Sequence, residues 1–120
     1  MFLIGLVTVG VVIMVFSVDA GLVLDARSRA QAAADAAALG AAPLTFAEFG
    51  SALSPRAEAA RLAEANGAEL LTCVCRLDKS WKPRIVEVTV AVARPIPGFG
   101  EAMIKASARA QFSPVDALGR

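Results

Sequence analysis

The chain has 120 residues, the size of one small domain, and its 12 basic residues nearly balance its 11 acidic ones. A formal net charge of +1 creates no positive field of the kind that captures nucleic acid, so we expect no nucleic-acid partner. Of the residues, 57% are hydrophobic. The chain has no histidine and so lacks the commonest general base and metal ligand.

The N-terminal segment is an almost unbroken apolar run from Phe2 to Val18, and its first charged residue is Asp19. These residues reach the lower limit of a bilayer span, and continuing to Leu24 exceeds it. We therefore predict that residues 1–24 lie in a membrane, with lipid as a partner. The side chains expected to face lipid or other helices are Phe2, Leu3, Ile4, Leu6, Val9, Val12, Ile13 and Phe16, with Asp19 at the edge.

Cleavage and orientation of this segment follow from its flanks. A secretory signal peptide needs basic residues before its apolar centre and a small-residue cleavage site. The basic residues are missing here, and Ser17-Val18-Asp19 and Val18-Asp19-Ala20 are poor cleavage sites. We expect an uncleaved helix, while removal of a leader peptide ahead of Met1 stays open. Arg27 and Arg29 follow the span and by the positive-inside rule would favour a cytoplasmic C-terminus, but charge counting alone does not settle the orientation, which needs another argument.

Residues 25–42 are an alanine-rich continuation of the same helix. Strong helix formers predict one rod from Phe2 to about Ala41, roughly 60 Å long at 1.5 Å per residue. Gly40 followed by Pro43 is the expected stop signal. A carboxylate at Asp19 is costly within an apolar helix, so we expect it at the membrane interface, with pairing to a neighbouring subunit as the alternative.

A globular head is predicted for residues 43–120. The segment Pro43–Leu53 is expected to be a connecting loop anchored by Phe46 and Phe49. A short helix should follow, because Ser54 and Pro55 suit a helix start and Asn66-Gly67 supplies a left-handed stop.

Three strands are predicted after this helix: Glu69–Leu77, Arg84–Arg94 and Met103–Phe112. The second alternates valines with polar residues, which is typical of a strand with one buried face. The connections, residues 78–83 and 95–100, are short and favour antiparallel neighbours. The expected fold class is α+β, with the helices covering one face of a three-stranded antiparallel sheet.

No catalytic site is evident. The sequence has no glycine-rich phosphate loop, no nucleophile elbow and no paired carboxylates in a plausible pocket, so we expect no enzyme, cofactor, metal site or small-molecule substrate. Cys73 and Cys75 are the only cysteines. They point to the same side of an extended strand, and three states stay open: free or packed thiols, a local disulfide, and a crosslink to another chain.

The helical signature resembles the TadE/TadG-like pilus-assembly proteins. The resemblance rests on the apolar span followed by Asp19-Ala20-Gly21 and the alanine-rich stretch from Arg27 to Ala42. The later run Ala59–Cys73, followed by a valine-rich strand and Ala106–Ala110, is similar to the small actinobacterial TadE-like branch. With these segments the resemblance extends over nearly the whole chain.

The resemblance implies a minor pilin or pseudopilin of a tight-adherence (type IVc) pilus, with other pilin subunits and the assembly machinery as partners. It also implies a head outside the cytoplasmic membrane and a possible place in an extracellular pilus. Gly5 and Leu6 stand where many type IV pilins have an early acidic residue, which favours initiation or the tip over the shaft. The alternative function is a non-polymerising, membrane-anchored binding module of the cell envelope.

Overall fold

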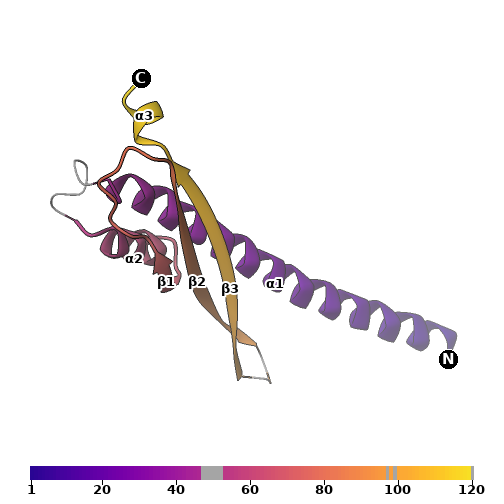
Figure 1. Cartoon of the computed structure of the whole chain (residues 1–120). Coiled ribbons are helices and arrows are strands. Elements are labelled where there is room, and N and C mark those ends of the chain that lie inside the picture. The colour runs from indigo at the N-terminus through magenta and orange to yellow at the C-terminus, as the bar shows by residue number, and fades with distance from the viewer. Residues whose placement is uncertain (47–52, 97, 99, 120) are drawn as a thin grey trace.

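The computed structural model describes residues 1–46, 53–96, 98 and 100–119, without the side chains of Asp19, Ala20 and Ile96. Its elements are α1 (Phe2–Leu44), α2 (Pro55–Ala65), β1 (Glu69–Val74), β2 (Arg84–Ile96), β3 (Gly100–Phe112) and α3 (Pro114–Ala117). The predicted α+β fold is confirmed. Figure 1 shows α1 projecting far beyond a head in which the sheet, of antiparallel order β1-β2-β3, lies against the helices. The molecule measures 74 × 28 × 17 Å.

The single long helix is also confirmed, but the expectation that Gly40 and Pro43 end it is wrong. The helix continues through both residues to Leu44, and Thr45 follows it with ordinary right-handed dihedral angles. Gly40 serves packing instead. A Cβ atom at this position would lie 2.0 Å from Cδ1 of Leu62, so the missing side chain is what lets α2 lie close to α1.

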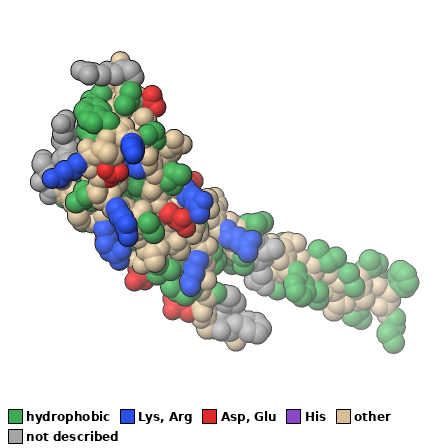
Figure 2. Space-filling view, viewed as in Figure 1, with side chains coloured by type: hydrophobic (Ala, Val, Ile, Leu, Met, Phe, Trp, Pro, Cys, Tyr) green, Lys and Arg blue, Asp and Glu red, His purple; other side chains and the backbone are tan. Residues whose placement is uncertain are grey.

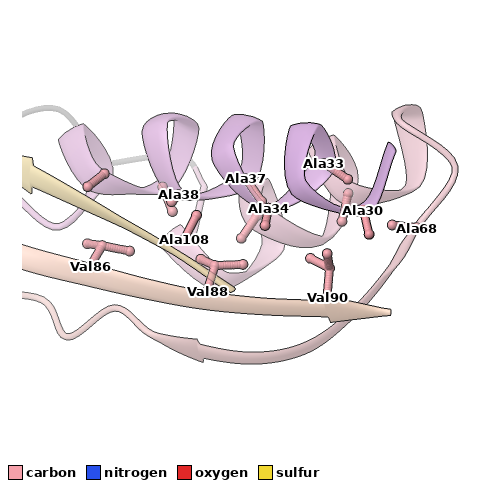
Figure 3. Packing of buried hydrophobic residues seen from close by; sticks show 14 of the residues in the cluster. Ala30, Ala33, Ala34, Ala37, Ala38, Ala68, Val86, Val88, Val90 and Ala108 are labelled. Atoms are coloured by element: carbon pink, nitrogen blue, oxygen red, sulfur yellow. The ribbon is translucent and has the colours of Figure 1, made fainter. Parts of the chain in front are cut away.

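The core is formed by alanines of α1 and α2 and valines of β2. Val86, Val88 and Val90 are at most 1% exposed, and Figure 3 shows them lying along the row of alanines on α1. The buried alanines of α1 are Ala26, Ala30, Ala33, Ala34, Ala37, Ala38, Ala41 and Ala42. Because their side chains are single methyl groups, the helix lies close to the sheet along its C-terminal half.

The start and end of α2 follow the sequence prediction. Ser54 Oγ accepts a hydrogen bond of 3.0 Å from the backbone N–H of Ala57, a cap that contributes about 1 kcal/mol. At the other end Gly67 has a φ of +76°, and the N–H of Ala68 donates to the carbonyl of Ala63 at 2.9 Å. This is the left-handed glycine stop that Asn66-Gly67 predicts.

The strand order and the buried valine face are as predicted, but three strand boundaries differ: the end of β1, the end of β2 and the start of β3. β1 ends at Val74 rather than Leu77, because the following chain turns to Thr45, whose carbonyl accepts a 2.9 Å hydrogen bond from the N–H of Asp78. The β2–β3 hairpin is longer than predicted, with Ile96 paired to Gly100. Pro95 fits because it lies beyond the end of β1, where β2 has no neighbour on that side.

The segment after β1 is held by Arg84. Its guanidinium donates hydrogen bonds to the backbone carbonyls of Thr45, Asp78, Ser80 and Lys82. Phe46 is 2% exposed, lies 5.7 Å below the same guanidinium and packs edge-on against Trp81 at a centroid distance of 5.1 Å. The predicted anchoring by Phe46 is therefore present, whereas Phe49 lies outside the described residues.

The short helix α3 was not predicted. Ser113 and Pro114 precede and begin it, which is the same pair that begins α2. The Ser-Pro signal was therefore available in the sequence, and Pro114 is buried against the head.

Candidate functional site

The first half of α1 has no partner within the chain. Every residue from 1 to 18 is exposed, and even large side chains such as Phe2 (88%) and Phe16 (70%) lie open. Figure 2 shows this part of the helix as hydrophobic and uncharged atoms that leave the mixed charged surface of the head. The other exposed side chains expected to face lipid or other helices are Leu3, Ile4, Leu6, Val9, Val12 and Ile13. Large apolar groups on every side of a helix require an apolar environment around it.

The two hydroxyl groups in this segment are satisfied by the helix itself. Thr8 Oγ1 donates to the carbonyl of Ile4 at 2.7 Å, and Ser17 Oγ donates to the carbonyl of Ile13 at 2.8 Å. Backbone groups in the middle of an α-helix bond to each other as well. Away from the helix ends, the segment thus presents no polar group that needs water, as a lipid environment demands.

By length and composition, α1 is the one described helix able to cross a membrane. The core helix of a soluble protein can be as long and as apolar, but its most apolar stretch would be buried. In α1 none of the most apolar stretch is buried. A signal sequence is also apolar, and like this stretch it lies near the N-terminus. The continuation of α1 into the head distinguishes this helix from an isolated signal segment.

The apolar and the packed halves of α1 meet near residue 25. Ala26 is the first buried residue of α1 among the described side chains. Asp25 pairs with Arg29 at 3.2 Å and with Arg94 of β2 at 3.7 Å, so charges appear where the head begins. Asp19 lies within the helical backbone, but its side chain is outside the described residues, and its predicted interfacial place stays a prediction.

Glycines hollow the surface of the apolar half. Cβ atoms at Gly5 and Gly10 would meet nothing within 4 Å, and Gly5 forms a shallow apolar hollow with Leu6 and Val9. A neighbouring helix could approach closely at such positions. The predicted residues of the apolar run share this helix, whereas the two cysteines lie in the head.

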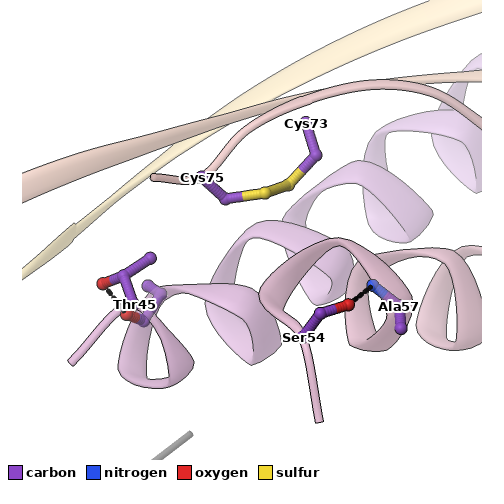
Figure 4. The surroundings of a disulfide bond; sticks show 6 residues. Thr45, Ser54, Ala57, Cys73 and Cys75 are labelled. Carbon is purple, nitrogen blue, oxygen red and sulfur yellow. Dashed lines mark hydrogen bonds between the residues drawn. A yellow bond between two sulfur atoms is a disulfide. The ribbon is translucent and has the colours of Figure 1, made fainter. Parts of the chain in front are cut away.

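Cys73 and Cys75 are joined to each other in the structure. Their Cα atoms are 5.4 Å apart, and Figure 4 shows the bonded sulfur atoms on the side of β1 that faces the helices. The strand ends at Val74, so Cys75 lies outside the extended segment. In a fully extended strand the two Cα atoms would be farther apart than the 5.4 Å found here. Both cysteines are partly buried against the core cluster, which fits a structural role.

The charged groups of the head form local structural contacts. A bidentate hydrogen-bonded pair with Arg61 lowers the pKa of Glu58, and hydrogen bonds from Ser80 lower the pKa of the half-buried Asp78 carboxyl group. Within the described part of the chain, no three His, Cys, Asp or Glu side chains gather in a way that could hold a metal ion.

A helix of this kind, half apolar and exposed and half packed on a small α+β head, defines a membrane-anchored class of protein. The model of the Flp pilus-assembly TadE/G-like family (Tad) matches residues 1–43, which correspond almost completely to α1. The predicted resemblance to this family is confirmed on this helix.

The match does not extend beyond α1 and does not distinguish an actinobacterial branch. A comparison with curated proteins finds no match. A comparison with solved structures finds none either. What is known of the head therefore comes from its own residues.

Proposed function

We propose that this chain is a structural minor pilin or pseudopilin of a Tad-type pilus, and not an enzyme. Residues 1–24 of α1 anchor in the cytoplasmic membrane and pack with other pilin subunits in a filament, or in an initiation or tip complex. Residues 25–42 continue the helix into the head, and residues 43–120 complete the head outside the membrane. The family match over α1 supports this proposal.

The observation that carries the proposal is the division of one uninterrupted helix into two environments. The head buries the helix from Ala26 onward, whereas residues 1–18 find no contact within the chain. A helix serving its own fold would be covered along its length. This one keeps its apolar half available for lipid before assembly and for neighbouring helices afterwards.

Fractionation of cells tests the assignment. Pili sheared from the cells are expected to contain the chain in small amounts beside the major subunit, and the membrane fraction is expected to hold the rest. If the chain stays entirely in membranes and is never found in pili or in an isolated assembly complex, the non-polymerising binding module becomes the better explanation.

Replacement of Asp19 by asparagine sharpens the test. Loss of pili with normal membrane levels of the chain would show that the carboxylate acts in assembly. Unchanged pili would leave the helix packing apolar and would assign Asp19 to the membrane interface. Val18→Asn, its neighbour on the same turn, serves as a control for a polar group as such.

A further inference from the structure

The disulfide between Cys73 and Cys75 joins residues that are already close along the chain. A disulfide between distant segments removes much of the freedom of the unfolded chain, whereas a bridge across a single residue closes a very short loop and removes little. The effect of this disulfide is therefore mainly local, and it falls on the residues where β1 ends.

The bridge requires a shorter backbone than a strand provides. Cα atoms two residues apart are about 6.6 Å apart in an extended strand, because each residue rises about 3.3 Å. The Cα atoms of Cys73 and Cys75 are 5.4 Å apart. The chain is thus contracted at Val74, the last residue of β1, and then turns towards α1, where the N–H of Asp78 donates to the carbonyl of Thr45.

The side chains beyond Val74 suit a longer strand. In a β1 continued with the same alternation, Cys75 and Leu77 would lie on the face of Cys73, which packs against the helices. Leu77 is instead 67% exposed. Continuing β1 to Leu77 would therefore bury apolar surface that now lies in water.

β2 has no strand neighbour on this side over the same stretch. Val74 pairs with Glu87, so residues 84–86 of β2 extend past the end of β1. A hollow of about 130 Å³ lies beside them, and its lining includes Arg76, Asp78 and Ile85. The register of the pairs already formed would place Arg76 opposite Ile85 if β1 continued.

The backbone groups of Ile85 face the side that a longer β1 would cover. Thr89 of β2 and Ser107 of β3 are opposite each other with hydroxyl oxygens 2.9 Å apart, which is typical of a pair that exchanges no backbone hydrogen bonds. The carbonyl of Ser107 accepts instead from Gln31 of α1 at 3.2 Å. Thr89 therefore turns its N–H and C=O groups towards β1, and by alternation Ile85 does the same. A longer β1 would give these groups Arg76 as a partner.

We propose that the Cys73–Cys75 disulfide is a redox-sensitive switch that sets the length of β1. With the disulfide formed, β1 ends at Val74 and leaves the edge of β2 open at Ile85. With two thiols, β1 continues to Leu77 and covers that edge. Reduction by a dithiol adds two electrons and two protons to the sulfur–sulfur bond, and the dithiol becomes a disulfide. Oxidation by the disulfide of a thiol oxidoreductase reverses this exchange.

The switch ties the shape of the head to its compartment. Thiols stay reduced in the cytoplasm and become oxidised outside it. In the proposed function, on which this use of the switch rests, the head passes from the first environment to the second. The edge of β2 therefore opens, with Val74 and Ile85 exposed at 60% and 63%, only after the head has left the cytoplasm.

Amide hydrogen exchange, followed by NMR on the full chain in detergent micelles, tests the switch. The amide groups of Arg76 and Ile85 should exchange fast in the oxidised chain and about tenfold more slowly after reduction with dithiothreitol, because they then pair with each other. The amide group of Thr89, which faces β1 in both forms, is the internal control and should stay protected throughout.

A chain with both cysteines replaced by serine separates the disulfide from the reductant. Cys73→Ser/Cys75→Ser cannot form the bridge, so the amides of Arg76 and Ile85 should be protected with and without dithiothreitol. Thr72→Ser, an equally small change on the opposite face of β1, keeps the disulfide and should respond to dithiothreitol as the wild type does.

Three outcomes overturn the proposal. Equal exchange of Arg76 and Ile85 in the oxidised, reduced and serine forms would mean that the disulfide does not set the end of β1. Loss of protection at Thr89 on reduction would make the disulfide a staple of the whole sheet. Protection in the reduced wild type but not in the serine variant would place the effect of dithiothreitol elsewhere.

The switch and the pilin assignment fail separately. The exchange measurement uses the isolated chain, so a negative result leaves the assignment to be decided by fractionation of pili. Absence of the chain from pili and assembly complexes would overturn the assignment, and it would leave the effect of the disulfide on β1 unchanged.

Discussion

The two halves of α1 place opposite kinds of side chain against their surroundings. In the head, the helix buries alanines such as Ala30, Ala34 and Ala37, all at 0% exposure. Outside the head it exposes residues as large as Phe2 and Phe16. Alanine therefore occupies the positions where the sheet and α2 of the same chain lie close to α1. Large side chains occupy the positions that face lipid or another helix.

The largest expected effect tests whether the exposed half is a membrane segment. Val12→Lys places a charge near the middle of the apolar run and should cost about 3 kcal/mol of insertion, roughly a hundredfold in the equilibrium. Ala32→Lys, at an exposed position of the head half, is the control. The measurement is the fraction of chain resistant to carbonate extraction after synthesis with membrane vesicles. Normal insertion of Val12→Lys would remove the membrane role of this half.

The second effect tests close packing in the other half. Ala34→Leu inserts a large side chain where no space remains, and we expect a loss of about 1–3 kcal/mol in the free energy of unfolding of the head. Ala32→Leu adds the same side chain to the exposed face and should change little. Urea unfolding in detergent, followed by circular dichroism, compares the two. Equal losses would contradict the tight interface.

A smaller effect is expected at the contact between α1 and α2. Gly40→Ala forces Leu62 to move, a cost of about 1–3 kcal/mol that is offset by up to about 1 kcal/mol of better helix propensity. Leu62→Ala removes the obstacle, so Gly40→Ala should be harmless or stabilising in that background. The double-mutant cycle from urea unfolding gives the coupling. Additive effects would show that the two residues do not compete for space.

The smallest effect concerns pH and is confined to the head. Because Arg61 lowers the pKa of Glu58 below the ordinary value of 4.5, the pair contributes stability above that pH. The contribution is lost as pH falls from the ordinary pKa through the lowered pKa of the folded state, because over this range the unfolded chain binds more protons at Glu58 than the folded chain does. Unfolding midpoints of wild type and Glu58→Gln should converge at acid pH. A constant difference would exclude the pair as the cause.

Local signals made most of the fold predictable. The alternating valines of β2, the Ser54 cap and the Gly67 stop act through neighbouring residues, so the sequence shows them directly. The apolar run was visible for the same reason. The family match then agrees with a signature carried almost completely by one helix.

The errors arose where distant residues decide. Gly40 looked like a helix end, but its lack of a side chain serves Leu62, which lies on another helix. The end of β1 depends on Thr45 and Arg84, far along the chain in both directions. The contact between Arg94 and Asp25 joins positions that no sequence spacing relates. The sequence alone therefore could not place the hairpin beside the apolar run.

The absence of a break in α1 gives the molecule the properties of a lever. The helix continues from the apolar run through Ala26 to Leu44, so the anchor and the head cannot rotate independently about a hinge. The part beyond residue 18 is about 39 Å long. Tilting the anchor by about 20°, which is ordinary for membrane helices, would carry the far end sideways by about 13 Å. Small changes around the anchor would thus become large displacements at the outer end of the head.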